Sequence, residues 1–157
     1  SMMLIHEGLD INSSGSNVSL KKYTSKLTDN LSKAYDFNNR KIKISLDVSD
    51  IILPAELAVP CGMIINELLT NSIKHAFPEN TEGTISLKIS SAGSNCELIV
   101  KDDGIGIQKN SNGEKFSGLG LQIVNKLVSQ LNGEIEILNK TGMEYRINIK
   151  TAQKNAA

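Results

Sequence analysis

A polar stripe on one predicted helix holds the first residues that could do chemistry. Glu67 and Asn71 lie one turn apart, and Lys74 and His75 follow one turn further on, so the four side chains fall within an arc of about 100°. A carboxylate one turn from an amide can hold a hard cation through oxygen atoms, and the two basic side chains can meet the anion that this cation accompanies. A solvated helix face would carry the same residues, and on this motif alone both interpretations stay open.

A second motif places aspartates and glycines directly after a predicted strand, in the segment Asp102-Asp103-Gly104-Ile105-Gly106. An acceptor carboxylate at a strand end suits recognition of an exocyclic amine such as that of adenine. Glycines beside it let a flat ring approach the backbone closely. The alternative is a charged turn that only connects two elements.

A third motif, Ser117-Gly118-Leu119-Gly120-Leu121, opens a predicted helix with two glycines. Free backbone N–H groups and the positive end of the helix dipole make such a helix start a candidate phosphate-binding site. A glycine hinge that serves only as a helix entry is the alternative. The segment is not a Walker loop, because the lysine and hydroxyl residue that follow the glycines in that motif are missing.

Hydrophobic periodicity predicts the elements that must position these motifs. Apolar residues at helical spacing predict three main helices. The first is capped by Ser19 and runs for about five turns, the second runs from after Pro60 to Phe77, and the third covers residues 119–131. Alternating apolar and polar residues predict strands at residues 42–48, 85–89, 96–100, 135–137 and 145–149, with turns at 92–95 and 139–142. Because no regular βαβ rhythm is present, we expect an α+β fold, a two-layer sandwich of helices on a sheet.

Composition excludes several classes of function. Lysine plus arginine and aspartate plus glutamate both total 17, so a net charge of zero argues against a partner that is a nucleic acid or an anionic lipid surface. Cys61 and Cys96 are too few for a disulfide-stapled scaffold, which favours a reducing, cytoplasmic setting. The longest apolar stretch, residues 58–65, is far shorter than the roughly 20 residues of a membrane span, so we expect no membrane contact from this segment.

Taken together and in this order, the three motifs resemble those of the GHKL ATPases, and within them the ATP-binding catalytic domain of sensor histidine kinases. The corresponding segments are Asn66-Glu67-Leu68-Leu69-Thr70-Asn71-Ser72, Asp102-Asp103-Gly104-Ile105-Gly106 and Gly118-Leu119-Gly120-Leu121. Residues 60–68 together with Lys74-His75-Ala76-Phe77-Pro78 are similar to the two-component kinase subgroup that has glutamate in the first position of the N box. The resemblance extends from Leu4 to about Ile149.

The resemblance implies a Bergerat fold, with a mixed sheet of about five strands, three main helices on one face, and ATP between the helical layer and a mobile lid at about residues 108–117. Asn71 would bind Mg²⁺, which bridges the phosphates, and Asp102 would accept from the adenine amine. Gly104 and Gly106 would give the ring clearance. Backbone N–H groups for phosphate would come from Ser117, Gly118, Leu119, Gly120 and Leu121. The side chains expected near the phosphates are Lys74 and His75, with Lys109 and Lys115 as candidates in the lid.

Two positions are ambiguous within this resemblance. The glutamate that matches Glu67 activates water in hydrolytic relatives, whereas in a kinase Glu67 would hold a magnesium-bound water. Relatives usually carry a small hydroxyl residue after a glycine near the last strand, but here Met143 follows Gly142. Unless Thr141 takes over that role, one polar contact near the adenine is lost.

The implied function is histidine protein kinase activity: the catalytic domain delivers the γ-phosphate of Mg-ATP to a histidine on another domain. We expect residues 1–12 to end a dimerisation and phosphoacceptor hairpin, residues 18–151 to form the catalytic domain and residues 152–157 to be a frayed tail. His6, beside Glu7, is not expected to be the acceptor, because too few residues precede it. Implied partners are the phosphoacceptor hairpin of the parent chain, which is expected to be a homodimer, and a response regulator receiver domain. The alternatives are a stand-alone ATPase or serine kinase with Glu67 as base, and a non-catalytic nucleotide-binding module.

Overall fold

The computed structural model describes residues 17–78, 81–106 and 118–151. The expected hairpin end at residues 1–12, the lid at 108–117 and the tail at 152–157 lie outside this part of the chain. The elements in chain order are β1 (Asn17–Ser19), α2 (Leu20–Ala34), α3 (Phe37–Arg40), β2 (Ile42–Val48), β3 (Ile52–Pro54), α4 (Ala55–His75), β4 (Gly83–Ala92), β5 (Asn95–Asp102), α5 (Leu119–Gln130), β6 (Glu134–Asn139) and β7 (Met143–Lys150).

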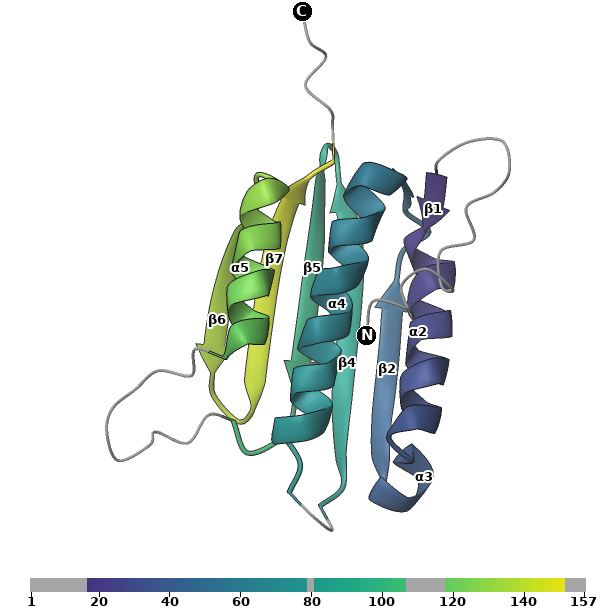
Figure 1. Cartoon of the computed structure of the whole chain (residues 1–157), viewed down its shortest axis with the longest axis vertical. Helices are drawn as coiled ribbons and strands as arrows, with labels where there is room; N and C mark the ends of the chain where they lie inside the picture. The colour runs from purple at the N-terminus through teal and green to yellow at the C-terminus, as the bar shows by residue number, and fades with distance from the viewer. Residues whose placement is uncertain (1–16, 79–80, 107–117, 152–157) are drawn as a thin grey trace, which may run out of the picture.

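Five strands form one mixed sheet in the order β2-β4-β5-β7-β6. Strand β2 pairs parallel with β4, and the other neighbours pair antiparallel. Helices α2, α4 and α5 all lie on one face of this sheet, with α4 in the middle (Figure 1). The predicted two-layer α+β sandwich with a mixed sheet and three main helices on one face is therefore confirmed.

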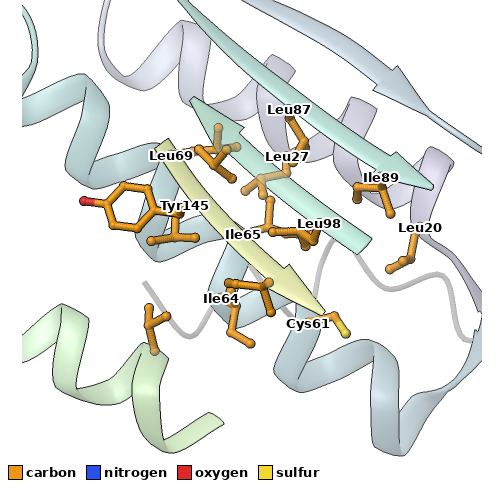
Figure 2. Close-up of a cluster of buried hydrophobic side chains, with 14 of the residues drawn as sticks. Leu20, Leu27, Cys61, Ile64, Ile65, Leu69, Leu87, Ile89, Leu98 and Tyr145 are labelled. Atoms are coloured by element: carbon orange, nitrogen blue, oxygen red, sulfur yellow. The ribbon is translucent and has the colours of Figure 1, made fainter. Parts of the chain in front are cut away.

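The core lies between the two layers. Residues of alternate positions on β4, among them Leu87 and Ile89, are buried. They share one hydrophobic cluster with Ile65 and Leu69 of α4 and with Leu27 of α2 (Figure 2). The residues between them point to the opposite face, where Lys88 and Asp47 form an exposed ion pair at 3.6 Å. This alternation is the reason that a period of two in the sequence predicted the strands correctly.

Helix α2 starts as predicted, with the Ser19 hydroxyl accepting a hydrogen bond from the backbone N–H of Lys22 at 3.3 Å. Its 15 residues make about four turns rather than five. None of the helices among the described residues is long and apolar enough to span a membrane.

The predicted start of α4 is wrong. The helix begins at Ala55, directly after Pro54, and Pro60 lies inside it. Proline removes one backbone donor and usually breaks a helix interior. Here Ala58, Pro60 and Cys61 are all buried, so packing against the core offsets the missing hydrogen bond. The helix ends at His75, two residues before the predicted end.

Three short elements were not predicted. Strands β1 and β3 form a separate two-stranded antiparallel sheet. Helix α3 is a four-residue turn bracketed by Asp36 and Lys41, both in the left-handed region at φ 50° and 53°, and anchored by the buried side chain of Phe37. Elements of three or four residues are too short to show a hydrophobic period.

Candidate functional site

Asp102 is the last residue of β5, and its carboxylate is almost fully enclosed, with 1% of the residue exposed. Oδ2 accepts a hydrogen bond from the Ser72 hydroxyl at 2.8 Å. Oδ1 accepts two bonds from the backbone N–H groups of Gly104 and Met143, each at 3.1 Å. A carboxylate offers about four acceptor positions, so these three donors leave one, on Oδ2.

Ser72 was not assigned a role from the sequence, although it lies directly after Asn71. Its position on α4 faces the apolar core, and the residue is 4% exposed. A hydroxyl among buried apolar residues needs a hydrogen-bond partner, which was the available signal. That partner is Asp102, 30 positions further along the chain.

Met143, which stands where relatives usually carry a hydroxyl residue, takes part in this network through its backbone. Met143 is buried and uses its backbone N–H on Asp102, whereas Ser72 brings a side-chain hydroxyl from the opposite layer. Thr141 lies exposed on the turn before β7. The expected loss of one polar contact near the adenine stays a prediction.

Tyr145 contributes to the same environment from β7. Burial raises the pKa of its hydroxyl, and the negative charge of Asp102 raises this pKa further. The phenol therefore stays neutral at physiological pH and presents no second negative charge to this end of the site.

The glycine turn after β5 packs tightly against the end of α4. A Cβ atom on Gly104 would collide with the backbone oxygen of Ala76. The same oxygen accepts a hydrogen bond from the N–H of Ile105 at 3.0 Å. Glycine at position 104 is thus required by helix-to-turn packing, and its role in clearance for a ring remains a prediction. Gly106 has φ 65°, a conformation that favours glycine.

Asp103, by contrast, is used for structure. Its Oδ1 accepts from the backbone N–H of Thr84 at 2.7 Å, and its own N–H donates to the Thr84 carbonyl at 3.2 Å. These bonds extend the pairing of β4 and β5 by one residue. The two adjacent aspartates therefore have separate tasks.

The polar stripe of α4 meets the start of α5. A Cβ atom on Gly120 would lie 2.8 Å from Glu67 Oε2 and 3.7 Å from Asn71 Nδ2, so this helix start approaches both side chains closely. Gly118 is the N-cap of α5 and has no side chain to satisfy the first N–H groups, and the first turn carries no acidic residue. Such a helix start can receive an anion.

The remaining predicted positions differ in their surroundings. Glu67 and Asn71 are half-buried, whereas Lys74 and His75 are exposed on the last turn of α4. Leu119 is 74% exposed at the start of α5, and Leu121 is partly buried against the core. Ser117, Lys109 and Lys115 lie outside the described residues.

A magnesium site built from protein side chains alone is not found in the described ranges, where no three histidine, cysteine, aspartate or glutamate residues could hold a metal together. An amide oxygen of Asn71 and the oxygens of a phosphate group would have to supply the ligands. Mg²⁺ commonly binds in this way, through one or two protein oxygens and substrate phosphates.

Comparisons with known proteins identify the family and the similar folds. Residues 56–153 match the family model described as histidine kinase-, DNA gyrase B- and HSP90-like ATPase. The blue-light-activated histidine kinase 2 of Erythrobacter litoralis is 31% identical over 115 residues, which are 72% of this chain and 33% of that protein. The sensor histidine kinase PdtaS of Mycobacterium tuberculosis is 37% identical over 100 residues, 62% of this chain and 20% of that protein. The chain thus spans about a third or less of the length of these relatives.

Among solved structures, the histidine kinase domain of the blue-light activated histidine kinase from Erythrobacter litoralis EL346 has a TM-score of 0.81 at 26% identity. The likeness covers 96% of this chain and 76% of that one. The family model covers the helix, the strand end and the helix start that meet in the candidate site. The chain belongs to the family of histidine kinase-, DNA gyrase B- and HSP90-like ATPases.

Proposed function

We propose that this chain is the ATP-binding catalytic domain of a two-component sensor histidine kinase, with residues 18–151 as the domain. The observation that carries the proposal is that the Asp102 turn and the glycine start of α5, which are distant in sequence, both meet the polar motif on α4. Ser72 of α4 contacts Asp102, and Gly120 lies against Glu67 and Asn71 of the same helix. One helix therefore connects a carboxylate suited to a purine amine with a helix start suited to phosphate.

Asp102 would bind the adenine end of the nucleotide. Its remaining acceptor position on Oδ2 would suit an exocyclic amine, and its three protein donors hold the carboxylate in one orientation. Donors fixed before the ligand arrives reduce the ordering cost of binding. The identity of the base would then depend on one hydrogen bond in a nearly water-free position.

The triphosphate would extend toward the start of α5. The backbone N–H groups of Leu119 and Gly120 would donate to it, and Asn71 would bind the magnesium ion through its amide oxygen. Bound Mg²⁺ would neutralise the phosphate charge and polarise the γ-phosphoryl group. At the exposed end of the same helix, Lys74 would add positive charge at the rim and His75 an imidazole that can form hydrogen bonds.

Glu67 would hold a magnesium-bound water rather than act as a base. It lies half-buried against Gly120, within reach of the ion that Asn71 would bind. The attacking group would be a histidine on a helical hairpin elsewhere in the parent protein. The parent protein would be a cytoplasmic homodimer, and it would pass the phosphate to a response regulator receiver domain. Replacement of Glu67 by glutamine should therefore reduce phosphotransfer and leave adenine recognition intact.

Calorimetric titration with ATP tests the proposal. The whole chain should bind ATP more tightly with Mg²⁺ than without it, and Asp102→Asn should weaken binding in both conditions. Addition of a matching phosphoacceptor hairpin and ATP labelled at the γ-phosphate should label the hairpin and leave this chain unlabelled. Absence of ATP binding, or binding that Asp102→Asn does not change, would refute the assignment.

A further inference from the structure

The C-terminal end of α4 is held by an arginine from another part of the chain. Arg40 Nη2 donates to the backbone oxygens of Ile73 at 3.0 Å and Phe77 at 3.3 Å. The last carbonyls of a helix have no partner within the helix, and the helix dipole makes this end negative. One guanidinium group therefore bonds a carbonyl of the last helical turn and one just beyond it, and it adds to the positive charge of Lys74 at this helix end.

Arg40 is itself placed by local hydrogen bonds and by the burial of a neighbouring ring. It is the last residue of α3, and its backbone N–H donates to the oxygen of Asp36 at 3.1 Å. The buried ring of Phe37 fixes this short helix to the core. The next residue, Lys41, accepts a bond from the N–H of Gly83 at 3.3 Å, which ties the segment to the start of β4. The side chain is half-buried and starts from a fixed backbone.

The helix end that Arg40 holds is the one against which the glycine turn rests. Ala76 lies between the two residues whose oxygens Arg40 binds, and its own oxygen accepts from the N–H of Ile105. The adjacent Gly104 packs on Ala76 so closely that a side chain would not fit there. Gly104 in turn donates its N–H to Asp102. A continuous series of contacts thus leads from Arg40 to the buried carboxylate.

A second contact fixes the same junction. A Cβ atom on Gly83 would collide with the ring of Phe77, so this ring lies directly on the start of β4. Arg40 binds the backbone oxygen of the same phenylalanine. Phe77, two residues after the end of α4, is therefore held on two sides. Loss of Arg40 would leave the ring contact and release the carbonyls of Ile73 and Phe77.

We infer that Arg40 is a positioning residue for the nucleotide site: it fixes the end of α4 so that the glycine turn after β5 keeps Asp102 oriented toward the adenine. The inference rests on the proposed nucleotide binding at Asp102. Arg40 touches neither nucleotide nor metal in this account. Its effect is transmitted through the bond between Ala76 and Ile105.

Arg40→Gln tests this inference in the whole chain, with Arg146→Gln as the matched control. Arg146 pairs with Glu144 on β7. The first readout needs no nucleotide: amide hydrogen exchange of Ile105, followed by NMR, should become at least about tenfold faster in Arg40→Gln than in wild type. Exchange in the centre of β4, at Leu87, should stay unchanged. Arg146→Gln should leave Ile105 unaffected.

The second readout is ATP affinity, which should fall about 3- to 10-fold in Arg40→Gln and stay unchanged in Arg146→Gln. Arg40→Lys should restore part of the affinity, because an ammonium group keeps the charge but lacks the planar geometry of the guanidinium. Unchanged Ile105 exchange, or equal acceleration at Ile105 and Leu87, would overturn the inference. So would wild-type ATP affinity in Arg40→Gln. Failure of the wild-type chain to bind ATP would overturn the proposed function instead.

Discussion

Replacement of Ser72 by alanine should destabilise the protein measurably, although it removes a single oxygen atom. The hydroxyl is the only side-chain donor to Asp102 among the described residues, and both residues are buried. Loss of a hydrogen bond to a charged group destabilises by about 1.5–3 kcal/mol. The better helix propensity of alanine stabilises by about 0.5 kcal/mol and offsets part of this loss. The free energy of unfolding should therefore fall by about 1–2.5 kcal/mol. For a chain of this size, that corresponds to a loss of roughly 2–10 °C in melting temperature.

Urea unfolding followed by circular dichroism measures this difference, with Ser32→Ala as the control. Ser32 lies on α2, and its hydroxyl donates to the backbone oxygen of Asp29 at 3.1 Å in an exposed position. That replacement should change stability by less than about 0.5 kcal/mol. If Ser72→Ala and Ser32→Ala unfold at the same urea concentration, the buried hydrogen bond does not hold Asp102 in place, and the reasoning fails.

Three further predictions concern the glycines and the thiols. Gly120→Ala should leave the melting temperature within about 2 °C of wild type, because the added methyl crowds only the far end of the Glu67 side chain and meets Asn71 at ordinary contact distance. It should weaken ATP binding; normal binding would place the phosphates elsewhere. Gly142→Ala should lower the melting temperature strongly, since φ is 131° and the Cβ would collide with the backbone oxygen at the end of β5; a melting temperature equal to that of wild type would contradict this. Burial raises the pKa of the Cys61 thiol to about 12 and of Cys96 to about 11, so their contribution to stability is complete below about pH 9 and should be lost progressively above it. Urea midpoints measured from pH 7 to 10.5 should show this decline, and Cys61→Ala should reduce its slope.

The sequence predicted the elements whose pattern is local. Alternation along β4 and β5 and the cap at Ser19 were correct, because in each case the residues that decide the structure lie within a few positions of one another. The predicted start of α4 was wrong because the contacts that decide it are not local. Pro60 is a helix breaker by local rules, and only packing against the core, which is not local, explains why the helix continues through it.

The contacts that organise the candidate site are also distant in sequence. Ser72 and Asp102 are 30 residues apart, and Arg40 binds an oxygen 33 residues further along the chain. Motif spacing could identify Asp102 as an acceptor, but not the hydroxyl that holds it. The methionine at position 143 predicts a lost polar contact near the adenine, but its backbone N–H bond to Asp102 is visible only in the structure.

The most direct test of the account is a comparison of ATP with inosine triphosphate, which carries an oxygen in place of the exocyclic amine. Wild-type chain should bind ATP about 10- to 100-fold more tightly than inosine triphosphate, because the carboxylate of Asp102 accepts from the amine and repels the oxygen. Asp102→Asn should lose most of this preference, since an amide can donate to the oxygen. Equal affinity of the wild-type chain for both nucleotides, or an unchanged ratio in Asp102→Asn, would contradict the central claim that Asp102 recognises adenine.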